Sequence, residues 1–234
     1  MRYAPALMVL VGVLVLAACG ENGGDNEQPA SLGPDEFQSQ VDNPLFPLER
    51  GAAKVYEGEE TDPDSGETVD IRVESSVLSE TETIAGIEAT VVEVRDLEDG
   101  ELVEMTRDYY AQNKDGTVYY LGEKVDDYED GEVVGHDGQW LAGEGDAQAG
   151  IFMPAEPKVE DEFEQERAPG VAEDVSKVVE VDQTVTTAAG AFSGCIKTED
   201  RDPISGAMEF KFYCPDVGLV REELEDGFIN LVSA

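Results

Sequence analysis

Apolar and polar residues alternate along much of the chain after residue 43, with the two-residue period that is typical of β-strands. The clearest run is 69–74, whose three apolar side chains fall on one face. The apolar segment 87–94 loses this period at Val91-Val92, so it either bulges or is covered on both faces. These runs predict successive strands.

A β-hairpin is predicted where two such runs, 105–112 and 117–122, flank the turn sequence 113–116. The glycine that closes this four-residue connection accommodates the positive φ of such a turn. Four tyrosines lie on the two strands of the hairpin: Tyr109, Tyr110, Tyr119 and Tyr120. They predict either packing within the sheet or the wall of a ligand cavity or partner surface.

Two more strands are expected near the C-terminus. In segment 178–186 three valines are expected to share one side: Val179, Val181 and Val185. In segment 207–214 the same holds for Met208, Phe210 and Phe212. Turn sequences rich in Asp, Pro and Gly separate all these runs, as in an antiparallel sheet or barrel.

The N-terminal residues 1–18 have the features of a signal peptide. Arg2 supplies a positive charge, and an apolar run from Leu7 to Leu16 is followed by two small alanines. This run is shorter than the stretch of about 20 apolar residues that a membrane-spanning helix needs. The chain is therefore expected to be exported.

The sequence Leu16-Ala17-Ala18-Cys19 resembles the lipobox of bacterial lipoproteins, in which small residues precede a cysteine at the end of the apolar run. In that family the cysteine is acylated and becomes the new N-terminus. The resemblance implies that Cys19 anchors the protein to the cell membrane or the outer membrane, since several acyl chains together bind stably. An ordinary secretory signal with a coincidental cysteine is the alternative.

Residues 20–42 are rich in Gly, Asn, Gln, Pro and acidic residues, and they include few large apolar side chains. This composition predicts that 19–42 comprise the lipidated cysteine and a flexible tether. One β-rich domain is expected over 43–234, a length sufficient for a sizeable core. The domain would lie in the periplasm or on the extracellular face.

A row of antiparallel strands on a lipid tether resembles the open-barrel lipoprotein carriers of the LolA/LolB and LppX type, in which a curved sheet encloses an apolar cavity. Segment 108–123 also resembles an uncharacterised lipoprotein family. We therefore expect a mainly β fold with a single antiparallel-sheet domain, an open barrel or half-barrel rather than a sandwich. Few short helices are expected, and the best candidates are 160–167 and 221–226.

The charge of the chain excludes several kinds of partner. It has 54 acidic and 15 basic residues, which give a net charge of -39. Such a surface repels nucleic-acid backbones and anionic lipid headgroups. Because the acids are spread over the tether, the turns and the strand faces, we expect a solvated coat with salt or divalent cations only as loose counterions, and a source exposed to high salt.

Cys195 and Cys214 are the two cysteines of the predicted domain, and export would place them in an oxidising compartment. They flank a predicted hairpin, and in one register they lie opposite each other and form a disulfide. A register shifted by one residue pairs Ile196 with Phe212, which matches the apolar faces better but separates the thiols. We expect the disulfide, and two free thiols are the alternative.

The chain contains no recognisable catalytic motif. His136 is the only histidine, it lies in a turn sequence, and no nucleophile elbow accompanies it. Segment 62–66 begins like a calcium loop, but Arg72 stands where the bidentate acid is needed. We therefore expect no catalytic residue, no metal and no cofactor.

The leading hypothesis is an exported, membrane-anchored and non-enzymatic binding domain for a lipid or another hydrophobic ligand. The alternative is a structural or protein-interaction module of the cell envelope that binds an envelope protein and no small molecule. An enzyme acting on envelope polymers is the least favoured hypothesis. A cleft that holds two close carboxylates in different environments would support an enzymatic function.

Overall fold

A single antiparallel sheet of fifteen strands makes up the part of the chain that the computed structural model describes, residues 33–38, 40–61 and 66–234. The strands are β1 (Phe37–Gln38), β2 (Ala53–Thr61), β3 (Thr68–Ile84), β4 (Ile87–Glu98), β5 (Glu101–Asn113), β6 (Val118–Glu129), β7 (Glu132–Gly135), β8 (Trp140–Leu141), β9 (Gly150–Met153), β10 (Glu162–Glu164), β11 (Val175–Thr187), β12 (Gly190–Arg201), β13 (Met208–Cys214), β14 (Gly218–Glu223) and β15 (Gly227–Ser233). The expected mainly β fold is confirmed.

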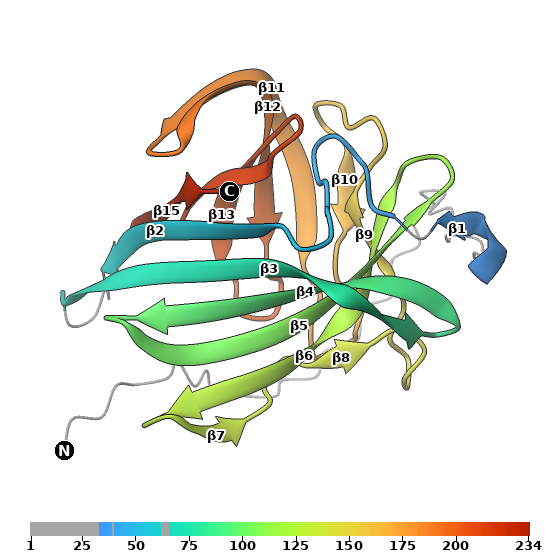
Figure 1. Cartoon of the computed structure of the whole chain (residues 1–234), viewed down its shortest axis with the longest axis horizontal. Coiled ribbons are helices and arrows are strands. Elements are labelled where there is room, and N and C mark those ends of the chain that lie inside the picture. Colours follow the sequence, from blue (N-terminus) through green and yellow to red (C-terminus); the bar gives the residue numbers. More distant parts are fainter. Residues whose placement is uncertain (1–32, 39, 62–65) are drawn as a thin grey trace, which may run out of the picture. The chain divides into compact units, whose positions relative to one another are not determined.

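The order of the strands follows from short hairpins and one long-range pairing. Neighbours in sequence are neighbours in the sheet from β10 to β15 and again from β2 to β7. The last strand, β15, pairs antiparallel with β2 and so joins these two series (Figure 1). Three short strands pair outside this order: β1 with β5, and β8 and β9 with β6.

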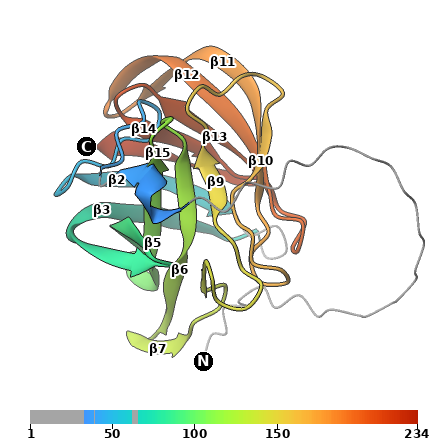
Figure 2. The same cartoon turned by 90° about the vertical axis from the view of Figure 1, so that its right-hand side faces the viewer.

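The sheet curves so that β10, at one end, approaches β9, which pairs with β6 near the other end, yet the sheet stays open (Figure 2). Gly150 of β9 marks the approach, because a Cβ there would lie 2.0 Å from the backbone oxygen of Gln165, just after β10. An isolated bridge joins Gln148 and Arg167 at this point, but no continuous ladder connects β9 with β10 in the part of the chain described. The expected open half-barrel is therefore observed.

The helices expected over 160–167 and 221–226 are wrong. Charge dominates both segments, and the structure places β10 in the first and the end of β14 in the second. Within the described ranges, the one helix is a 3-10 turn, η1 (Pro34–Glu36). No helix found there has the length and apolar character needed to cross a membrane.

The folded unit begins at Gly33 rather than at residue 43, because the end of the expected tether packs on the sheet. Phe37 of β1 contacts the ring of Tyr119 edge to face, with 5.6 Å between ring centroids. Val41 is buried, and the Gln112 side chain accepts a hydrogen bond from the backbone N–H of Asp42 at 2.8 Å. The predicted signal peptide and Cys19 lie outside the described residues.

The predicted tyrosine hairpin forms between β5 and β6, and Gly116 in its turn has a φ of 100°. Segment 87–94 lies in β4, which pairs regularly with β5 across Val91 and Val92. Both valines are buried, so this strand is covered on both faces. The irregularity lies in its neighbour β3, between Val77 and Thr81.

The face expected for segment 178–186 is not the one observed, whereas Phe210 and Phe212 of segment 207–214 do share one side, because the Lys197 ammonium lies over both rings. In β11, Val178 is buried and Val181 is 37% exposed, because the pairing with β12 shifts register repeatedly beyond Val178. In β13, the ammonium of Lys197 lies 4.1 Å from the ring centroid of Phe210 on one side of the strand. Its other side presents Lys211, with Tyr213, to the interior of the sheet.

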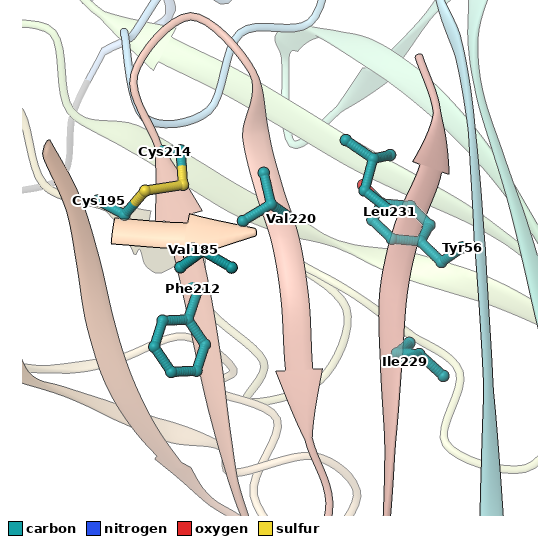
Figure 3. Close-up of a cluster of buried hydrophobic side chains, with 8 residues drawn as sticks. All are labelled: Tyr56, Val185, Cys195, Phe212, Cys214, Val220, Ile229 and Leu231. Atoms are coloured by element: carbon teal, nitrogen blue, oxygen red, sulfur yellow. A yellow bond between two sulfur atoms is a disulfide. The ribbon is translucent and has the colours of Figure 1, made fainter. Parts of the chain in front are cut away.

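The disulfide between Cys195 and Cys214 is present. The β12–β13 ladder pairs Ile196 with Tyr213, which sets the two cysteines opposite each other at the next position. The alternative register is not adopted. The bridge belongs to a cluster of buried side chains to which β2, β11, β13, β14 and β15 also contribute (Figure 3): Tyr56, Val185, Phe212, Val220, Ile229 and Leu231.

Removing this bridge is expected to destabilise the fold. The double variant Cys195→Ser, Cys214→Ser should lose about 3 kcal/mol in free energy of unfolding, because the bridge closes a loop of about 20 residues in the unfolded chain. Urea denaturation under non-reducing conditions measures the loss. A decrease below about 1 kcal/mol would show that the bridge hardly constrains the unfolded state.

Candidate functional site: an acid-lined cavity within the sheet

The inner face of the curved sheet encloses a cavity of about 430 Å³. Strands β2 to β6 and β13 to β15 contribute to its wall, and β9 and the loop around Phe46 close it. Because side chains alternate between the faces of a strand, every second residue of these strands points into this space. The cavity is the site that the fold builds.

One wall of the cavity is hydrocarbon. It is formed mainly by the in-phase residues of β3 and β4, with one isoleucine from β15: Ile71, Val73, Val77, Val92, Val94 and Ile229. The alternation that predicts strand 69–74 from the sequence is the same pattern that places Ile71 and Val73 here. This wall offers a ligand apolar contact and no hydrogen bond.

Aromatic rings form a second part of the lining. The rings of Tyr110 and Tyr120 stack with 4.9 Å between their centroids and 17° between their planes. Phe152 of β9 meets Tyr110 edge-on at 4.9 Å, and Phe46 lies 4.3 Å from Phe152. All four side chains line the cavity.

Two of the four tyrosines expected as cavity residues therefore line the cavity. Tyr109 and Tyr119 are the direct neighbours of Tyr110 and Tyr120, and alternation turns them to the other face. There the ammonium of Lys124 lies 5.7 Å from the Tyr109 ring centroid, and Tyr119 contacts Phe37. Tyr109 and Tyr119 are buried as parts of the sheet.

Five acidic side chains complete the lining: Asp96, Asp108, Glu166, Asp174 and Glu222. None of them is expected in a cavity from the sequence. The basic side chains of the lining are Lys54 and Lys211. Lys54 donates a hydrogen bond to the backbone oxygen of Val217, and burial lowers its pKa to about 8. The charged part of the wall is thus predominantly acidic.

Burial and mutual repulsion hold protons on these acids. Burial, reinforced by Glu104, raises the pKa of Asp96 to about 7. Burial, reinforced by Asp174, raises the pKa of Glu166 to about 8. Behind the lining, burial together with the charge of Asp108 raises the pKa of Glu123 to about 9. These groups titrate at or above neutral pH rather than near pH 4.

Within the part of the chain that the structure describes, Asp108 has one carboxylate oxygen that is buried without a hydrogen-bond partner. The residue is 8% exposed, and burial raises the pKa of its carboxyl to about 6. The Tyr110 hydroxyl donates a long hydrogen bond of 3.5 Å to Oδ2. Oδ1 is buried and has no hydrogen-bond partner among the described residues. A buried acceptor without a partner costs about 1–3 kcal/mol, which a bound donor or cation would recover.

Lys211 of β13 lies among three acids, one of which, Glu222, belongs to the cavity lining. Its ammonium lies 2.6 Å from the Glu209 carboxylate, 3.6 Å from Asp200 and 3.9 Å from Glu222. Burial alone would favour the neutral amine, but these carboxylates raise the pKa of Lys211 well above its ordinary value. Asp200 is held in turn by the Ser176 hydroxyl, which donates to Oδ1 at 2.6 Å. Lys211 therefore stays charged.

Sequence reasoning assigned all these acids to the solvated coat. A signal for two of them was present: Asp108 lies two residues before Tyr110, and Asp96 lies two residues after Val94, in phase with the inward face. Lys211 stands between two phenylalanines, which marks it as facing the opposite way. No local pattern identifies Glu166 or Asp174, which lie outside the strands.

The remaining candidates from the sequence lie elsewhere. His136 is exposed in a turn, where its Nδ1 lies 2.7 Å from the Val125 carbonyl oxygen and 3.0 Å from the Asp126 carboxylate. Cys195 and Cys214 are joined in the disulfide. No group of three or more Asp, Glu, His or Cys side chains arranged to hold a metal ion is found in the described part of the chain.

Comparison with known proteins gives little guidance. No family model matches the chain, and no curated protein matches its sequence. Among solved structures, the crystal structure of a "putative lipoprotein" from Parabacteroides distasonis ATCC 8503 is similar over 81% of this chain and 97% of the other. The TM-score is 0.41 and the sequence identity is 17%. At this level the similarity assigns no function to the cavity.

Proposed function

We propose that this protein is an exported lipoprotein, anchored through Cys19, that holds a small, partly hydrophobic ligand in the cavity of its β-sheet domain without transforming it. The signal peptide and the lipobox-like sequence before Cys19 support export and anchoring. The disulfide is in keeping with an oxidising compartment. The domain would then work in the periplasm or on the extracellular face.

The observation that carries the binding function is the cavity of about 430 Å³ with its hydrocarbon and aromatic lining. Ligand sites commonly have volumes of about 300–1,000 Å³, mostly apolar walls and a few polar groups that orient the ligand. A cavity of about 150 Å³ holds one benzene molecule. The space therefore favours a compact ligand of a few rings or a short chain over a lipid with two long acyl chains.

An enzymatic function is a second candidate, because two close carboxylates differ in environment. Burial opposes ionisation of Glu209, yet Lys211 lowers its pKa to about 2, whereas burial raises the pKa of Glu222 well above its ordinary value. Glycosidases hold their two carboxyl groups about 5–9.5 Å apart. Glu209 and Glu222 share a hydrogen bond, which is too close for that chemistry, so we rank binding first.

Filling the cavity tests the binding function. Ser75 of β3 lines the cavity, and Ser75→Trp is expected to reduce binding of the neutral dye Nile red at least tenfold, because the indole would occupy the space. Dye fluorescence measures binding, and circular dichroism checks the fold. The matched control is Ser76→Trp, at the next position of β3, which faces the other side of the sheet. Equal binding by Ser75→Trp and Ser76→Trp would contradict a cavity site.

A further inference from the structure

The lining of the cavity contains more acidic side chains than basic ones. Five of its lining residues are acidic and two are basic. Lys54 hydrogen-bonds to Val217, and Lys211 forms ion pairs with Glu222 and with two acids behind the lining. Among the described residues, no ion pair joins a basic side chain to the other four acids of the lining: Asp96, Asp108, Glu166 and Asp174.

Asp108 supplies a specific point of attachment. Its side chain lines the cavity at more than nine-tenths burial, and its Oδ1 is unpartnered. The neighbouring inward residue on β5 is Tyr110, whose ring stacks on Tyr120. Aromatic rings attract organic cations through the negative potential of their faces, and a buried carboxylate adds the opposite charge.

The hydrocarbon part of the lining selects the remainder of the ligand, and it adjoins the acid, because Val92 of β4 pairs directly with Asp108 of β5. The valines and isoleucines of β3, β4 and β15 contact hydrocarbon and cannot bind a charged or hydrogen-bonding group. The described residues include no constellation for a metal ion. An anionic ligand would meet the repulsion of the acidic wall. A molecule that satisfies both walls is apolar at one end and positively charged at the other.

Building on the proposed binding function, we propose that the cavity takes an amphipathic organic cation, an amine or quaternary ammonium with a short apolar group. The charged group lies against Asp108 beside Tyr110 and Tyr120, and the apolar group lies against Val92 and Val94. The acids of the lining serve to bind this cation. They are not a generic solvated surface.

Matched probes test this inference by isothermal titration calorimetry. Hexyltrimethylammonium, hexanol and hexanoate share one chain and differ in charge. The full domain is expected to bind the cation at least tenfold more tightly than hexanol and to bind hexanoate most weakly. Tetramethylammonium, which lacks the chain, controls for attraction to the acidic surface, and moderate salt suppresses that attraction.

Asp108→Asn should weaken binding of hexyltrimethylammonium about tenfold and leave hexanol binding unchanged, because the amide keeps the shape and removes the charge. Glu132→Gln, an exposed substitution on β7 with the same change in net charge, is the control and should bind as the unmodified domain does. If Asp108→Asn still binds the cation as tightly as the control variant, the assignment to Asp108 is wrong.

Proton release gives a second readout that needs no variant. A bound cation favours the ionised acids, so binding near pH 6–7 should release protons, and affinity should increase as the pH rises through this range. Titration in two buffers of different ionisation enthalpy measures the release. The groups facing Asp108 come from β4, β5, β6 and the segment after β10: Asp96, Glu104, Thr106, Tyr110, Tyr120, Glu123 and Glu166. Only the carboxyl groups among them share in this proton release.

The outcomes separate the two proposals. If the domain binds hexanol and Nile red, shows no preference for the cation and releases no protons, the cation inference is overturned and the binding function remains intact. No binding of Nile red or of any of the three six-carbon probes would overturn the binding function itself. Tight binding of tetramethylammonium, equal to that of the longer cation, would show attraction to the surface rather than to the cavity and would overturn the inference.

Discussion

Lowering the pH from about 8.5 to about 5 is expected to increase the free energy of unfolding of this protein by several kcal/mol. The cause is the group of buried acids around the cavity. In the folded protein, burial raises the pKa of Glu123 to about 9, of Glu166 to about 8 and of Asp96 to about 7. In the unfolded chain such groups have pKa values near 4.

The sign follows from proton binding in the two states. Between about pH 4 and the raised pKa of each acid, the folded state binds more protons than the unfolded state, so stability falls as the pH rises. The contribution of each acid is complete below about pH 4 and is lost as the pH passes its folded-state value. For Asp108, the difference between 3.8 and about 6 corresponds to about 3 kcal/mol.

Glu209 limits the increase in the free energy of unfolding at acidic pH. Burial raises its pKa, but the charge of Lys211 outweighs burial and lowers the value to about 2. Its contribution to stability is therefore present above about pH 4.5 and is lost as the pH falls toward 2. Maximum stability is expected near pH 4.5–5, where Glu209 is still ionised and the cavity acids are protonated.

Urea denaturation at a series of pH values, at constant ionic strength, measures this dependence. Glu123→Gln should flatten the decrease in stability between about pH 5 and about pH 9, because it removes the group with the highest of these raised pKa values. The exposed substitution Glu132→Gln controls for general repulsion in a chain of net charge -39 and should leave the slope nearly unchanged. A stability that rises from pH 5 to pH 8.5 would contradict the assignment of these acids to the interior.

The fold could be predicted from the sequence to the extent that it is local. Each hairpin joins strands adjacent in sequence, so the alternation of 69–74 and the turn 113–116 specify pairs such as β5 with β6. The predicted pairing of Cys195 with Cys214 also corresponds to the observed register of β12 and β13. Helices were wrongly expected in 160–167 because charge periodicity in a short segment does not distinguish a strand from a helix.

The acidic wall could not be predicted in the same way. In a chain with 54 acidic residues, the presence of Asp108 or Glu166 in the sequence says nothing about burial. Their proximity depends on the pairing of β15 with β2 and on the approach of β9 to the segment after β10. Both contacts join distant parts of the chain, and no local pattern encodes them. Asp108 lies two residues from Tyr110 and therefore on the same face of β5, but this indicates burial only when it is known that this face is enclosed.

Lys211→Met is expected to lower the free energy of unfolding by about 3–5 kcal/mol near pH 7, because it removes the cation from a buried group of acids. Methionine preserves much of the apolar part of the side chain, so the loss is electrostatic. The Asp200 carboxylate is 3% exposed and Glu222 is 14% exposed, so both would remain largely buried without their cation. Burial of unpaired carboxylates costs far more than loss of a surface ion pair.

The pH again distinguishes the electrostatic cause from a packing defect. At about pH 5 the acids left by Lys211→Met can take up protons, so the variant should recover much of the lost stability, whereas a packing defect would persist. Lys211→Arg retains the charge and should lie close to the unmodified protein. The control Lys177→Met breaks an exposed pair with Glu160 and should unfold at nearly the same urea concentration as the unmodified protein. If Lys211→Met is equally destabilised at both pH values, the carboxylates around Lys211 are not the source of the loss, and this lysine stabilises the sheet through its hydrocarbon chain.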